Sequence, residues 1–218
     1  MTTASLEKRV VSQFQHPRGW LGHLAGWVMA RRPSNRTRNL WTLDLLEIAP
    51  GDRVLEIGFG PGFALREAAK RAPTGWVVGV DHSEAMLSQA RERNHKATLA
   101  GRVKLVLARA EDLPEEIGVF EKIFAVNVVQ FWRDAPGVIA HLAARLKPGG
   151  RLAVTYQPRQ RGARREDADA MATRLVGWME AARLTDVRSA RLELRPVPAV
   201  CVLGARPKGS EGGSTGRP

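Results

Sequence analysis

Val54-Leu-Glu-Ile-Gly-Phe-Gly-Pro-Gly62 carries more structural information than any other part of this 218-residue chain. Residues 53–57 have the apolar density of a buried parallel strand, and residues 64–71 have helical spacing and good helix formers. The three alternate glycines therefore occupy a strand-to-helix turn. Glycine permits positive φ there and lets a ligand lie against backbone N–H groups, so the stretch predicts the floor of a nucleotide-type cofactor site.

The spacing of these glycines separates two classes of cofactor. A dinucleotide fingerprint, G-x-G-x-x-G, would place its third glycine where this chain has Phe63. The register Glu56-x-Gly58-x-Gly60-x-Gly62 instead resembles the acid-x-G-x-G-x-G motif of class I S-adenosylmethionine-dependent methyltransferases. The resemblance implies S-adenosyl-L-methionine as the cofactor, in place of a nicotinamide dinucleotide.

Further landmarks of that family follow in the expected order. They are a strand at 76–80 before Asp81, a strand at 103–107 before residues 108–114, a strand at 122–126 before residues 127–134, and a strand at 151–156. Before the last strand, a helix from about Pro136 is expected to end at Leu146-Lys-Pro-Gly-Gly150, with the glycines in left-handed geometry. The resemblance spans about residues 40–206.

The resemblance implies an α/β fold, a Rossmann-like three-layer sandwich with a seven-stranded, mostly parallel sheet. A helix at about 166–183 would precede an antiparallel edge hairpin of strands at about 187–195 and 199–206, with prolines in its turn. Three parts are predicted: an N-terminal helical lid (1–49), the methyltransferase domain (50–206) and a disordered tail without apolar residues to bury (207–218).

The family motif also implies which residues hold the cofactor. Glu56 would position its ammonium group, and Asp81, 23 positions after Gly58, would accept hydrogen bonds from ribose hydroxyls. Many relatives carry an acid where Arg109 stands, so the polar adenine contact is assigned to Glu111. The full predicted set is Glu56, Gly58, Phe59, Gly60, Gly62, Asp81, His82, Met86, Ala110, Glu111, Asn127 and Val128. Purely structural roles, such as a helix cap for Asp81 and core packing for Met86, stay open.

The implied reaction needs little from the protein beyond alignment. A sulfonium methyl group is already activated, so an in-line oxygen, nitrogen or carbon nucleophile of a small organic molecule can accept it. No catalytic residue is assigned. Gln130, Phe131 and Trp132, after the fourth predicted strand, are candidate substrate residues, with ordinary packing as the alternative. His16 and His23 are possible bases that we do not assign.

The N-terminal region is expected to contain substrate information. Residues 20, 21, 24, 27 and 28 form one apolar stripe on a predicted helix, and a second helix is expected at about 35–47. The stripe is interpreted as part of a lid over the cofactor. Because arginines flank the stripe, the alternative is that this helix binds a membrane surface, as expected for a phospholipid methyltransferase.

The net charge of +12 raises the question of a nucleic-acid substrate. The charge is mostly spread, with concentrations only at residues 31–38 and in the basic loop at 158–165, whose role is not assigned. The segment Asn127-Val-Val-Gln130 also differs from the N-P-P-aromatic motif of amino-directed nucleic-acid methyltransferases. RNA or DNA is therefore a less favoured substrate, and a non-catalytic S-adenosylmethionine-binding protein is a further alternative.

Cysteine and histidine usage gives no support for a metal. Cys201 is the single cysteine and is expected to pack in a buried strand, and the five histidines lack ligand spacing. No apolar run approaches the roughly 18 residues needed to cross a bilayer, and no signal peptide is recognised. We therefore expect a cytoplasmic protein; the sequence does not indicate its oligomeric state.

Overall fold

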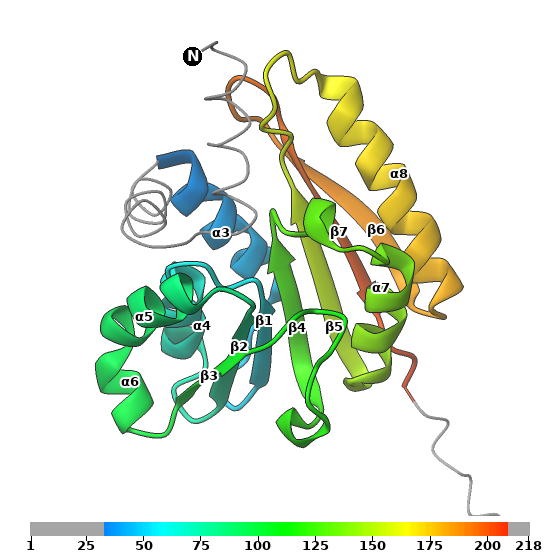
Figure 1. Cartoon of the computed structure of the whole chain (residues 1–218). Helices are drawn as coiled ribbons and strands as arrows, with labels where there is room; N and C mark the ends of the chain where they lie inside the picture. Colours follow the sequence, from blue (N-terminus) through cyan, green and yellow to red (C-terminus); the bar gives the residue numbers. More distant parts are fainter. Residues whose placement is uncertain (1–32, 209–218) are drawn as a thin grey trace, which may run out of the picture.

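The computed structural model describes residues 33–208, which form a seven-stranded sheet with helices on both faces (Figure 1). The strands are β1 (Arg53–Ile57), β2 (Trp76–Asp81), β3 (Val103–Leu107), β4 (Phe120–Val126), β5 (Leu146–Tyr156), β6 (Thr185–Leu192) and β7 (Ala199–Ala205). The helices are α3 (Pro33–Leu46), α4 (Phe63–Arg71), α5 (Glu84–Arg93), α6 (His95–Leu99), α7 (Ala135–Ala144) and α8 (Arg165–Ala181), with short 3-10 turns at Glu115–Ile117 and Val129–Phe131.

The strand order is β3-β2-β1-β4-β5-β7-β6. Strands β1 to β5 run parallel, whereas β7 is antiparallel to both of its neighbours. The predicted fold, a mostly parallel sheet with an antiparallel C-terminal hairpin, is confirmed. Parallel strands joined by helices are covered on both faces, which explains the near-continuous apolar runs in the sequence.

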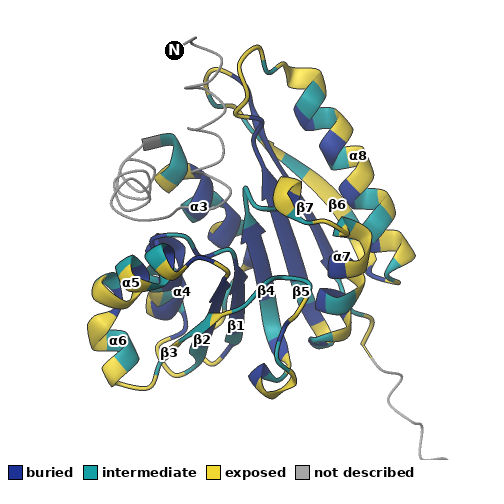
Figure 2. Cartoon of the chain, viewed as in Figure 1, coloured by how far each residue is buried: buried dark blue, intermediate teal, exposed yellow. Residues whose placement is uncertain are grey.

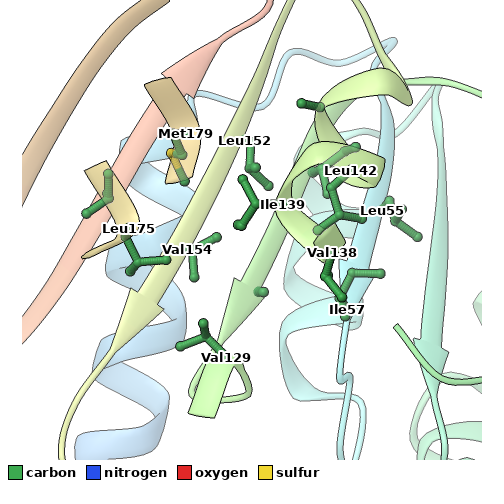
Figure 3. Close-up of a cluster of buried hydrophobic side chains, with 14 of the residues drawn as sticks. Leu55, Ile57, Val129, Val138, Ile139, Leu142, Leu152, Val154, Leu175 and Met179 are labelled. Atoms are coloured by element: carbon green, nitrogen blue, oxygen red, sulfur yellow. The ribbon is translucent and has the colours of Figure 1, made fainter. Parts of the chain in front are cut away.

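Two hydrophobic clusters pack on the opposite faces of this sheet. Ile139 of α7 and Leu175 of α8 belong to one cluster, together with Leu55 of β1 (Figure 3). Leu43 of α3 and Leu65 of α4 belong to the other. Because side chains alternate along a strand, the faces of β1 are divided between the clusters. Figure 2 shows the central strands buried and the outer faces of the helices exposed.

Most of the predicted elements are present, with shifted ends. Strands β1 and β3 have the predicted bounds; β2 includes Asp81, and β4 begins two residues earlier than expected. Helix α3 matches the second helix predicted for the N-terminal region, and its Leu43 is fully buried in the core. The apolar stripe at residues 20–28 and most of the predicted tail lie outside the described residues, so the lid and the tail stay predictions.

The predicted end of the helix before β5 is wrong. Helix α7 ends at Ala144, and residues 146–150 are already the first part of β5. The backbone N–H of Phe120 donates to the carbonyl of Arg145 at 2.9 Å, and this bond draws the chain into the sheet directly after the helix. Gly149 does have left-handed geometry, with φ of 77°, but inside the strand and not at a helix end.

Within the described residues, no helix combines the length and the apolar character that a membrane crossing requires. The cytoplasmic location stays a prediction from the sequence.

Gly79 of β2 allows the glycine-rich turn to pack onto the sheet. A Cβ atom at this position would lie 2.8 Å from Leu65 of α4 and 2.8 Å from the ring of Phe59 in the turn. Both side chains are at least 97% buried, so neither has free space into which it can move. Because Gly79 has no side chain, Phe59 of the turn and Leu65 of α4 can pack directly against the middle of the sheet.

Gly79→Ala is expected to destabilise the protein by about 1–3 kcal/mol through overpacking. The matched control is Gly177→Ala on exposed α8, where a Cβ atom meets nothing within 4 Å. That change should raise stability by up to about 1 kcal/mol because alanine is the better helix former. Urea unfolding measures both; equal effects of the two substitutions would contradict the packing role of Gly79.

Candidate functional site

A cavity of about 850 Å³ opens where the parallel strands reach their carboxyl ends. Its wall includes the turn after β1, the end of β2, the segments after β3, β4 and β5, and the first turns of α3. This edge is where open α/β sheets bind their ligands. Every predicted cofactor residue except Gly62, and all three predicted substrate residues, line this cavity.

The three motif glycines all have positive φ, at 74° for Gly58, 50° for Gly60 and 76° for Gly62. Their surroundings differ. A Cβ atom at Gly58 would lie 2.3 Å from Val128, and one at Gly62 would lie 2.8 Å from Cβ of Ala90, whereas one at Gly60 would meet nothing within 4 Å. Gly60 therefore presents bare backbone to open space, and Gly62 serves the packing of α4 against α5.

Asp81 fastens the turn after β1 to the end of β2. Its Oδ2 accepts a hydrogen bond from the N–H of Gly60 at 2.8 Å, and its Oδ1 accepts one from the N–H of Ser83 at 3.0 Å. Burial raises the pKa of Asp81, and these two N–H donors act in the opposite direction. Ser83, whose hydroxyl accepts from the N–H of Met86, caps α5, so Asp81 does not fill the helix-cap role.

Glu56 brings an unsatisfied buried polar atom to the cavity wall. Its side chain is 3% exposed, and its Oε2 has no hydrogen-bond partner in the described structure. Burial raises the pKa of Glu56 well above its ordinary value, the negative charge of Asp81 raises it further, and the N–H of Leu65 offsets part of this. An orphaned carboxylate oxygen at a cavity wall fits a positively charged donor on a ligand, as the ammonium group of S-adenosylmethionine would supply.

The predicted adenine contact, Glu111, lines the cavity in the segment after β3. Oε1 of Glu111 accepts a hydrogen bond from the N–H of Arg133 at 2.9 Å, and Oε2 lies 3.8 Å from Nε of Arg109. These contacts hold the carboxylate at the wall. Met86 is 4% exposed and belongs to the core cluster under α5 while also lining the cavity, so core packing does not exclude the predicted cofactor contact. His82 is more open, with 41% of its side chain exposed.

The predicted substrate residues follow β4. Asn127, with φ of 56°, exchanges two hydrogen bonds with the backbone of Gln157 after β5, at 3.1 and 2.7 Å. Gln130 donates to the carbonyl of Asn127 at 2.9 Å, which closes the turn. Phe131 is 42% exposed, an uncommon state for an aromatic ring. Together with Trp132 it gives this side of the cavity an apolar surface.

Sequence reasoning missed a set of polar residues that also line the cavity. They come from α3 and from the segment after β5: Asn35, Arg38, Asn39, Gln157, Arg159 and Gln160. The charge concentrations at 31–38 and 158–165 were the available signal, but nothing in the sequence indicated that the two segments meet. Among residues 33–208 no group of His, Cys, Asp or Glu is arranged to hold a metal ion.

Comparisons with known proteins identify methyltransferases as relatives of this chain. A family model described as a methyltransferase domain matches residues 54–150. An uncharacterized methyltransferase of Bacillus subtilis (strain 168), YdaC, is 33% identical over 184 residues, covering 84% of this chain and 98% of that protein. The demethylmenaquinone methyltransferase of Symbiobacterium thermophilum is 35% identical over 104 residues, covering 47% of this chain but only 41% of that protein.

Among solved structures, the N-methyltransferase NodS from Bradyrhizobium japonicum WM9, in complex with S-adenosyl-L-homocysteine, has a similar fold. The TM-score is 0.68 at 16% identity, and the match covers 84% of this chain and 92% of that chain.

Glu56→Gln is expected to stabilise the ligand-free protein while weakening its ligand. Because the pKa of Glu56 is raised from 4.5 in the fold, the folded protein holds this proton more tightly than the unfolded chain. Stability is therefore lost as the pH rises above that ordinary value, and the neutral glutamine removes the loss. The melting temperature of the variant should exceed that of the parent at about pH 8, by a margin that shrinks towards about pH 5.

The same substitution should reduce affinity for S-adenosylhomocysteine about tenfold or more, because a charge-assisted hydrogen bond is lost. Glu180→Gln, at an exposed position of α8, is the control and should change neither quantity. A Glu56→Gln protein that is less stable than the parent at about pH 8 would contradict the assignment of an uncompensated buried carboxylate.

Proposed function

Because the chain belongs to the class I S-adenosylmethionine-dependent methyltransferases, we propose that it transfers the cofactor's methyl group to an oxygen, nitrogen or carbon atom of a small organic molecule. The family assignment follows from the B. subtilis relative, which the chain spans almost completely. The observation that carries the proposal is the orphaned Glu56 oxygen at the wall of a cavity whose floor is the bare backbone of Gly60.

The chain's own residues are suited to binding and orientation. When bound, S-adenosylmethionine supplies a methyl group that is already activated, so positioning is the main contribution needed from the protein. Glu56 would accept from its ammonium group, the turn at Gly60 would lie against its methionine part, and Asp81 would accept from its ribose. Oδ2 of Asp81 accepts from the N–H of Gly60 and Oδ1 from the N–H of Ser83, and a carboxylate oxygen can accept more than one hydrogen bond.

The size and lining of the cavity support a small-molecule acceptor. Pockets for small ligands are usually about 300–1,000 Å³, and the cavity here falls in that range. Phe131 and Trp132 would enclose an apolar part of the acceptor, with Gln130 at the same edge. The sequence left three alternatives: a nucleic-acid acceptor, a phospholipid acceptor, or cofactor binding without transfer. They differ in which molecule, if any, receives the methyl group.

Calorimetry with S-adenosylhomocysteine tests the cofactor site. The parent protein should bind it and should not bind NADH. Asp81→Asn should weaken binding about tenfold or more, because an amide cannot accept with both of its terminal atoms. Asp169→Asn, which removes a surface ion pair to Arg191 on the far side of the sheet, is the matched control and should bind like the parent. Binding of NADH without S-adenosylhomocysteine would overturn the assignment.

Transfer is tested with the purified full chain and tritium-labelled S-adenosylmethionine added to a fractionated cell extract. We expect label in the small-molecule fraction. Label in RNA, DNA or lipid would replace the proposed acceptor class, and cofactor binding with no label in any fraction would favour a binding protein.

A further inference from the structure

Two arginines from distant parts of the chain converge on one side-chain oxygen in the cavity wall. Arg38 of α3 and Arg159, after β5, both donate through Nη1 to Oε1 of Gln157, the latter at 3.2 Å. Arg38 also donates through Nη2 to Oδ1 of Asn35 at 2.8 Å, and Arg159 donates to the hydroxyl of Ser34 at 3.3 Å. The two acceptors of Arg38, Gln157 and Asn35, are neutral groups.

Arg38 is buried without a compensating negative charge among these acceptors. Its residue surface is 4% exposed, and its Nε has no hydrogen-bond partner in the described structure. A guanidinium carries five N–H donors, and the two contacts above use two of them. Burial, together with the positive charge of Arg159, lowers the pKa of Arg38 to about 10. A buried cation in this state is stabilised strongly by an anion that enters the cavity.

Gln157 holds the two guanidinium groups in place. Its side chain is fully buried, and its Nε2 donates to the carbonyl of Val197 at 2.8 Å, which fixes the direction of Oε1. Its backbone is bound to Asn127 on the neighbouring strand end. The arginines are thus positioned by a rigid part of the sheet edge, as a binding site requires.

The position of this cluster assigns it to the acceptor side of the cavity. Gln157 follows β5, and β4 separates β5 from β1, which carries Glu56. Neighbouring strands lie about 4.8 Å apart, so the strand ends that carry Gln157 and Glu56 are roughly 10 Å apart across the sheet. Most groups assigned to the cofactor lie in or directly after β1, β2 and β3, and Asn127 and Val128, which follow β4, lie between those groups and the end of β5.

We propose that Arg38 and Arg159 bind an anionic group, a carboxylate or a phosphate, on the methyl acceptor. This inference rests on the proposed function, since it names a property of the molecule that accepts the methyl group. It also gives a role to Arg159 of the basic loop at 158–165. The acceptor would place its anion between α3 and the end of β5 and its apolar part against Phe131 and Trp132.

Calorimetry on the full chain, saturated with S-adenosylhomocysteine, tests the inference with small probes. Benzoate and phenyl phosphate are compared with neutral benzamide, and inorganic phosphate serves as an anion without an apolar part. The variants are Arg38→Met and Arg159→Met, with Arg38→Lys as the charge-conserving form. The matched control is Arg174→Met, an exposed arginine of α8 that contacts its own helix.

We expect the parent to bind benzoate or phenyl phosphate more tightly than benzamide, and the preferred probe distinguishes carboxylate from phosphate. Arg38→Met and Arg159→Met should each weaken anion binding about tenfold or more, with part of the affinity kept in Arg38→Lys, whereas Arg174→Met should behave like the parent. Arg159→Met, on a loop, keeps the test open if Arg38→Met does not fold.

Three results would overturn the inference. In the first, benzamide binds as tightly as the anions. In the second, the anions bind both Met variants as tightly as they bind the parent, and Arg38 would then only connect α3 to the sheet. Alternatively, Arg38→Met could lose S-adenosylhomocysteine but keep methylthioadenosine, which lacks the amino-acid part; the arginine would then serve the cofactor. In all three cases the parent still binds S-adenosylhomocysteine, whereas failure of that binding would reject the proposed function itself.

Discussion

Strand β1 is paired on both sides by parallel strands, and this register determines where every group of the site lies. Ile57 is opposite Val80 of β2 and Ala125 of β4, so the three strands end at nearly the same level. The residues that follow them leave the sheet together, which brings the glycine turn and Asp81 to one edge. A slip of one residue would move Glu56 to the other face, into an apolar cluster, and would dismantle the site.

The site combines two buried carboxylates that resist ionisation. Burial raises the pKa of both Glu56 and Asp81, and the charge of Asp81 adds to the shift at Glu56. Across the cavity the opposite problem occurs at Arg38, a buried cation beside a second arginine. One cavity therefore contains a buried carboxyl group and a buried guanidinium group that each have an unpartnered polar atom, and a fold that tolerates such groups does so where they meet a ligand.

The sequence was sufficient to predict elements whose signals are local. Strands β1 and β3 were predicted at their observed bounds because each is a short apolar run beside glycine or polar residues, and the cofactor wall follows from the ends of such strands. Prediction from the sequence failed where contacts between residues far apart in the chain determine the structure. The backbone bond between Phe120 and Arg145 ends α7 early, and the contact between Arg38 and Gln157 joins residues 119 positions apart. A glycine of the motif can also serve packing instead of ligand binding. Gly62 allows α4 to pack against α5 and does not line the cavity.

Cys201, in the middle of β7, is the single thiol of the chain and is fully buried between β5 and β6. Burial raises its pKa to about 12, so the reactive thiolate is scarce in the folded protein as well as inaccessible. The thiol can meet a reagent only when the antiparallel end of the sheet opens. The rate at which Cys201 is alkylated therefore reports how often this part of the sheet opens, and the measurement requires no engineered label.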